Sequence, residues 1–117
     1  MEDLLIEVLR KSGYPVYLQG SLTDDDKYPD HFYTFWNNSS EGAAYYDNKE
    51  RALIYNYDVN FYSCDPEKVY SQLRASIQEL KSQGFIISGD GYTVASDEPT
   101  HDGRGVNVLF KKYIGGN

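Results

Sequence analysis

The stretch L-I-Y-N-Y-D-V-N-F-Y-S-C runs from Leu53 to Cys64 and alternates apolar with polar residues. Its odd-numbered apolar and aromatic positions are Leu53, Tyr55, Tyr57, Val59 and Phe61. Because successive side chains of a strand point to opposite faces, this spacing predicts a strand with one apolar face. Burying each such side chain is worth about 1.5–3 kcal/mol, so we expect this strand at the centre of an antiparallel sheet, beneath a helix.

Two other segments carry the pattern of amphipathic helices. Residues 2–12 place leucine and valine on one stripe, with acidic residues at the start and basic residues at the end. Residues 65–83 begin with Asp65 as the N-cap and Pro66 in the first helical position. The apolar stripe of this second helix consists of Val69, Leu73, Ile77 and Leu80. A glycine followed by an aromatic residue predicts the end of each helix.

Shorter runs of apolar residues predict the remaining strands. These runs cover residues 14–19, 31–37, 43–46, 85–88, 92–95 and 106–113. Pro15 lacks an N–H and suits an edge strand, whereas the aromatic run 31–37 predicts a strand that is at least partly covered on both faces. We expect residues 85–88 and 92–95 to form a hairpin around Gly89-Asp90-Gly91.

The order of these elements predicts an α+β fold, in which two helices flank an antiparallel sheet of about four to six strands. Residues 1–117 are expected to form a single domain, since this length closes one hydrophobic core.

Composition restricts the possible functions. The net charge of −7 argues against direct nucleic-acid recognition and favours a basic protein partner. The twelve tyrosines suit surfaces that are half-buried or become buried on association. A single cysteine, Cys64, is consistent with a reducing compartment and is expected to be buried at the end of its strand. No apolar run is long enough for a membrane span, and the start lacks a basic signal-peptide region, so we expect neither membrane insertion nor export.

Two polar segments are candidates for function, and we expect both to be loops. Residues 20–30 contain Asp24, Asp25 and Asp26, but the ligand spacing and glycine of an EF-hand loop are missing, so we expect no metal site there. Residues 97–105 group the polar side chains of Asp97, Glu98, His101, Asp102 and Arg104.

The second loop allows three interpretations. In an enzyme, His101 would be a general base and Arg104 would hold an anionic substrate. Neither a paired nucleophile nor a second histidine lies nearby in the sequence, so we expect no catalytic residue and no enzyme. We also expect no cofactor, because no phosphate-binding glycine loop or zinc-type cluster is present. The remaining interpretations stay open: His101 and Arg104 pair with carboxylates inside the chain, or they face an acidic neighbouring subunit.

Five segments, in this order, resemble a family of small tail-completion proteins of long-tailed phages and of prophages in Gram-positive bacteria. They are Y-P-V-Y-L-Q-G (14–20), F-Y-T-F-W-N (32–37), Y-D-N (46–48), V-N-F-Y-S-C-D-P (59–66) and D-E-P-T-H-D-G-R-G (97–105). The resemblance implies a tail terminator, or tail-to-head joining protein, with helices flanking an antiparallel sheet. Such a protein forms a six-fold ring on the head-proximal end of the virion tail, after assembly in the host cytoplasm. Its implied partners are further copies of itself, the tail tube protein and a head-completion or neck protein.

A ring requires that one patch of each copy meets a different patch on the next copy. We expect the loops 22–30 and 97–105 to supply parts of that contact, with Arg104 facing an aspartate of the neighbouring acidic loop. Two alternatives stay open. One is a head-completion or connector adaptor, which would bind the portal; the other is a small acidic regulatory or inhibitory binding protein.

Overall fold

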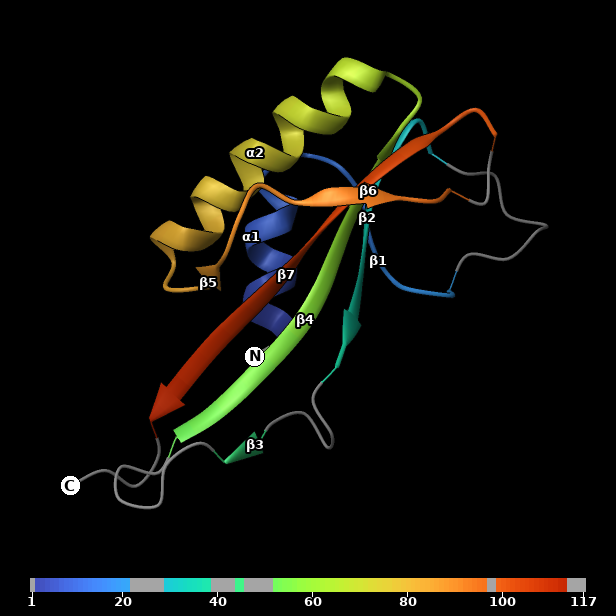
Figure 1. Ribbon diagram of the computed structural model, residues 1–117. Helices are drawn as coiled ribbons and strands as arrows, with labels where there is room; N and C mark the ends of the chain where they lie inside the picture. The colour runs from blue at the N-terminus through green and yellow to red at the C-terminus, as the bar shows by residue number, and fades with distance from the viewer. Residues whose placement is uncertain (1, 22–28, 39–43, 46–51, 97–98, 114–117) are drawn as a thin grey trace.

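The computed structural model describes residues 2–21, 29–38, 44–45, 52–96 and 99–113. In chain order its elements are α1 (Glu2–Arg10), β1 (Val16–Leu18), β2 (His31–Asn37), β3 (Ala44–Tyr45), β4 (Ala52–Ser63), α2 (Pro66–Ser82), β5 (Ile86–Ile87), β6 (Tyr92–Val94) and β7 (Asp102–Tyr113). The strands form one sheet in the order β1-β2-β4-β7-β5, in which β3 also pairs with β4 and β6 with β7 (Figure 1). The α+β class predicted from the sequence is therefore confirmed.

The long strand β4 occupies the centre of the sheet, as its alternating sequence predicts. It pairs antiparallel with β2 along one edge and, over its whole length, antiparallel with β7 along the other. The odd-numbered Tyr57, Val59 and Phe61 are no more than 1% exposed. Cys64 lies one residue beyond the strand and is exposed, so the prediction of a buried thiol is wrong. The last buried side chain at this end is that of Ser63.

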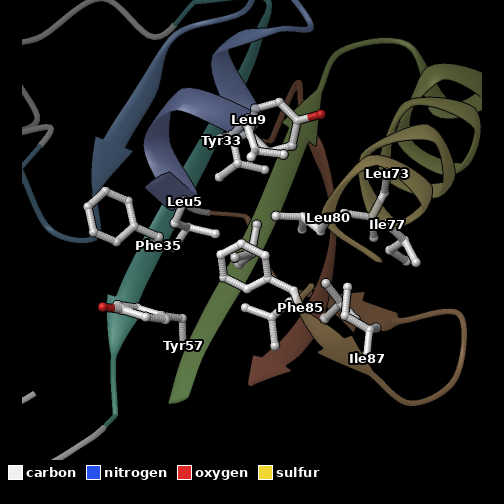
Figure 2. Packing of buried hydrophobic residues seen from close by; sticks show 14 of the residues in the cluster. Leu5, Leu9, Tyr33, Phe35, Tyr57, Leu73, Ile77, Leu80, Phe85 and Ile87 are labelled. Atoms are coloured by element: carbon white, nitrogen blue, oxygen red, sulfur yellow. The ribbon is translucent and has the colours of Figure 1, made fainter. Parts of the chain in front are cut away.

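Both helices pack on the same face of the sheet, the one that carries the odd-numbered residues of β4. Figure 2 shows Leu5 and Leu9 of α1 and Leu80 of α2 converging on this face. The four predicted stripe residues of α2 are no more than 4% exposed. Tyr33 of β2 is fully buried in the same core, where its hydroxyl accepts a hydrogen bond from Gln72 Nε2 at 3.0 Å and also bonds the Ser76 hydroxyl.

The ends of α2 follow the signals in its sequence. Asp65 accepts a hydrogen bond from the backbone N–H of Glu67 at 3.0 Å, which satisfies one donor of the first turn. Beyond the last turn, Gly84 has φ +97°, and the N–H of Phe85 donates to the carbonyl of Leu80 at 3.0 Å.

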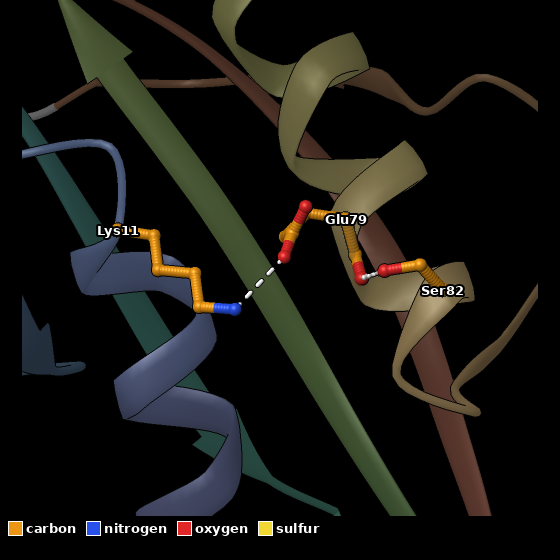
Figure 3. Close-up of polar contacts among 3 residues, drawn as sticks. All are labelled: Lys11, Glu79 and Ser82. Carbon is orange, nitrogen blue, oxygen red and sulfur yellow. Dashed lines mark hydrogen bonds and ion pairs between the residues drawn. The ribbon is translucent and has the colours of Figure 1, made fainter.

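One ion pair joins the two helices. Lys11 Nζ lies 2.9 Å from Glu79 Oε1, and the Ser82 hydroxyl donates to the backbone carbonyl of Glu79 at 2.6 Å (Figure 3). The Lys11 and Glu79 side chains are 51% and 41% exposed, so water screens the pair and it contributes at most about 1 kcal/mol. Burial of the apolar stripes, rather than this ion pair, holds the helices in place.

The sheet is mixed rather than purely antiparallel, because β1 runs parallel to β2, with Val16 opposite Tyr33. As predicted, β1 is an edge strand that follows Pro15. Parallel neighbours require a crossover of about a dozen residues, and the segment 19–30 between the two strands supplies it. The length of the acidic segment therefore follows from the topology and is not in itself a sign of binding.

The predicted hairpin between residues 85–88 and 92–95 is wrong. β5 and β6 both pair antiparallel with β7, with Ile87 opposite Val108 and Tyr92 opposite Gly105. Four residues, 88–91, thus stand opposite only two, 106–107, and the edge strand is kinked there. Gly89 and Gly91 accommodate the kink with φ values of +78° and +99°.

The predicted loop 97–105 is also shorter than expected, because β7 begins at Asp102. Gly103 and Gly105 lie inside this strand, where side chains of β4 lie over them. A Cβ on Gly103 would lie 2.6 Å from the Tyr62 ring, and one on Gly105 would lie 2.2 Å from Asn60 Oδ1. These two glycines, which suggested a loop, instead lie in a strand, where the missing Cβ lets side chains of β4 lie close to the backbone of β7.

The kink gives a first prediction, with a control in the same turn. Gly89→Ala should lower the free energy of unfolding by about 1–2 kcal/mol, because it places a side chain at positive φ. Gly91→Ala should cost at least about 1 kcal/mol more, since its Cβ would also lie 2.7 Å from the carbonyl oxygen of Gly105. Urea denaturation of both variants measures the difference, and equal losses would contradict the kinked strand.

Candidate functional site

A cleft of about 410 Å³ lies between the start of α2 and the β6–β7 pair. Pro66, Val69 and Tyr70 form its helical wall, and residues 93–96 and 101–104 form the opposite wall. The structure thus brings together three of the residues that the sequence singled out, His101, Asp102 and Arg104.

Arg104 connects the kinked edge strand to α2. Its Nη2 donates to the carbonyl oxygens of Gly91 at 3.1 Å and Asp90 at 3.3 Å. Its Cζ lies 4.8 Å from the ring centroid of Tyr70, whose side chain is 55% exposed. In the part of the chain that the structure describes, the partners of Arg104 are therefore carbonyl oxygens and an aromatic ring, whereas the intrachain interpretation expected carboxylates.

His101 lines the larger cleft and is held there by hydrogen bonds within the chain. The ring is only 9% exposed and lies edge-on to Phe32, with 5.8 Å between the ring centroids. Its Nε2 is 2.8 Å from the carbonyl oxygen of Pro29, and a carbonyl can only accept, so Nε2 carries the proton. Nδ1 lies 3.0 Å from the Thr100 hydroxyl. His101 thus anchors the β6–β7 connection to the segment that precedes β2.

An aromatic cluster covers part of the sheet face opposite the helices. The Phe32 ring stacks on Tyr62 at a centroid distance of 5.2 Å and meets Tyr17 edge-on at 6.1 Å. Phe32 is 3% exposed, although neither α1 nor α2 packs on this face. Because Phe32 is buried here while Trp36 is 47% exposed, the prediction that the aromatic run 31–37 is at least partly covered on both faces is confirmed.

A second, smaller cleft of about 130 Å³ lies on the other side of the Arg104–Tyr70 contact. Arg74, Lys81 and Arg104 line it, and Asp90 is the only carboxylate in its lining. In a chain with a net charge of −7, this is a locally positive groove. We refer to the surface of Tyr70, Arg74, Lys81 and Arg104 as the basic groove.

Sequence reasoning missed the contribution of α2 to this groove. The groove uses helix residues that lie off the apolar stripe, namely Tyr70, Arg74 and Lys81. The sequence signal that could have predicted it is a tyrosine and two cations on the polar side of one helix. The other sequence candidates, Asp24, Asp25, Asp26, Asp97 and Glu98, lie outside the described residues. Asp102 is exposed at the start of β7, opposite Ser63 of β4.

The fold and the groove define an α+β protein with a positively charged groove between α2 and the kinked edge strand of its sheet. Within the described ranges, no group of three histidine, cysteine or acidic side chains is placed to hold a metal ion. Neither helix there combines the length and hydrophobicity needed to cross a membrane. Comparison of the sequence with protein-family models finds no match, and comparison with curated proteins finds none.

Arg104 gives the second prediction. Arg104→Lys should speed hydrogen exchange of the β6 amides and lower the free energy of unfolding by about 1 kcal/mol. The reason is that an ammonium group lacks the planar fork that bonds both carbonyls while stacking on Tyr70. Arg74→Lys, the same change at an exposed cation of the same groove, should leave β6 exchange unaltered. Equal exchange in the two variants would contradict the role of Arg104 in the kink.

Proposed function

We propose that the protein is a tail-completion subunit of a phage or prophage, a terminator that forms a ring on the head-proximal end of the tail tube. The five sequence segments that resemble this family support the proposal, as does an α+β fold with two helices packed on a largely antiparallel sheet. The observation that carries it furthest is the basic groove, because a ring needs one patch that complements a different patch on the next copy.

The acidic segment of a neighbouring copy is the proposed occupant of the groove. Asp24, Asp25 and Asp26 provide three adjacent negative charges in the sequence, and the groove provides three cations beside an exposed tyrosine ring. Complementary charge of this kind affects the orientation and the rate of association more than it affects the binding affinity. Since Arg104 already bonds two carbonyls of its own chain, Arg74 and Lys81 supply the greater part of the accessible charge.

The tube end provides the direct test of the proposed role. Purified protein added to tail tubes that lack a terminator should cap one end of each tube as a ring, visible by electron microscopy. A head-completion or connector adaptor would instead bind filled heads, and a regulatory protein would bind neither. Binding to heads in place of tubes would overturn the terminator role.

Charge reversal tests the proposed contact between copies. Arg74→Glu should weaken ring formation about tenfold, equivalent to about 1.4 kcal/mol, because it sets like charges against each other. Asp25→Arg combined with Arg74→Glu should restore much of the loss. Arg10→Glu, which makes the same charge change on α1, is the matched control and should leave assembly unaffected. Equal effects of the two reversals would show that only net charge matters.

A further inference from the structure

Part of the sheet face opposite the helices is exposed to solvent. There Trp36 of β2 pairs directly with Asp58 of β4, and Asp58 pairs directly with Asn107 of β7. Directly opposed residues of neighbouring strands bring their Cβ atoms to about 4.5–5.5 Å on one face. Trp36 is 47% exposed, and so is Tyr92, which the kinked edge strand places on the far side of β7. Trp36, Asp58 and Asn107 therefore lie in one row across the sheet, and Tyr92, opposite Gly105, lies on the same face two residues along β7 from Asn107.

A hydrogen bond from Asn107 orients the carboxylate of Asp58. Asn107 Nδ2 donates to Asp58 Oδ1 at 3.1 Å, and it also bonds Asn56 Oδ1 at 2.6 Å and the carbonyl oxygen of Tyr57 at 3.2 Å. Asn107 is neutral, so it orients the carboxylate without compensating its charge. Among the described residues, Asp58 has no cationic partner. The ion pair that the described part of the chain contains lies elsewhere, between Lys11 and Glu79.

Aromatic rings flank this carboxylate on both sides. Trp36 is its cross-strand neighbour on β2. On the other side, Tyr92 lies opposite Gly105 of β7, two residues from the Asn107 that pairs with Asp58, and on the same face. Burial raises the pKa of the Tyr92 phenol, and the nearby Asp58 carboxylate raises that pKa further. An oriented carboxylate between exposed aromatic rings combines the two features that bind a protein cation: a charge-assisted hydrogen bond and contact with a π face.

We propose that Asp58, Trp36 and Tyr92 form a docking site for an arginine or lysine side chain of a basic partner protein. The net charge of −7 favours such a partner. A second copy docked symmetrically about Asp58 is disfavoured, because that arrangement would bring two Asp58 carboxylates together. The proposal is independent of the tail-completion role, because it depends only on side chains of this face and not on the basic groove.

An arginine peptide provides the probe. Acetyl-Gly-Gly-Arg-Gly-Gly-amide, titrated into the isotope-labelled full chain, should shift the amide resonances of residues 36, 58, 92 and 107 and the indole resonance of Trp36. The same peptide with neutral citrulline in place of arginine should bind at least about fivefold more weakly. Asp58→Asn should weaken arginine binding about fivefold, because the amide keeps the oxygen that accepts from Asn107 and loses only the charge.

The controls separate this site from general charge attraction. Glu7→Gln removes the same charge from an exposed position of α1 and should leave the affinity for the arginine peptide unchanged. Trp36→Ala should weaken binding about as much as Asp58→Asn. The proposal is overturned if Glu7→Gln and Asp58→Asn act equally, if the shifts spread over the acidic surface, or if concentration-dependent dimerisation through residues 36, 58 and 92 appears without peptide.

Discussion

Burial of one face of β4 beneath both helices is the constraint on which the rest of the structure depends. Tyr57, Val59 and Phe61 are closed off from water by leucines of α1 and α2, and the neighbouring strands extend the same apolar face on either side. Because side chains of a strand alternate, committing the odd positions to this core places the even positions on the opposite face. Neither α1 nor α2 covers them there.

This one-sidedness divides the molecule into two kinds of surface. Along α2, from Tyr70 to Lys81, the helix and the kinked edge strand enclose the basic groove, in which Arg104 joins the two elements. On the uncovered face, aromatic side chains follow the sheet from the buried Phe32 to the exposed Trp36 and Tyr92. The tyrosines also fall into two groups. Tyr33 and Tyr57 are buried in the core, whereas Tyr70 and Tyr92 are exposed on the surface.

Glycine has two different uses in the C-terminal half of the chain. Gly89 and Gly91 adopt positive φ values and let the edge strand take up two extra residues beside β7. Gly103 and Gly105 lie within regular strand, where the absence of a Cβ lets Tyr62 and Asn60 lie across the backbone. A reading of glycine as a turn signal alone therefore predicted a hairpin where there is a kink, and a loop where a strand has begun.

The sequence alone determined the features that depend on neighbours along the chain. The alternation around residues 53–64, the stripe of α2 and the Asp65-Pro66 start all act over a few residues, so local periodicity and capping chemistry were sufficient to predict them. Only the tertiary structure decided the parallel pairing of β1 with β2, the carbonyl partners of Arg104 and the placement of Trp36, Asp58 and Tyr92 on one face of the sheet. These features depend on the register between strands that are distant in sequence, and that register is set by how the whole apolar surface packs, which no local pattern encodes.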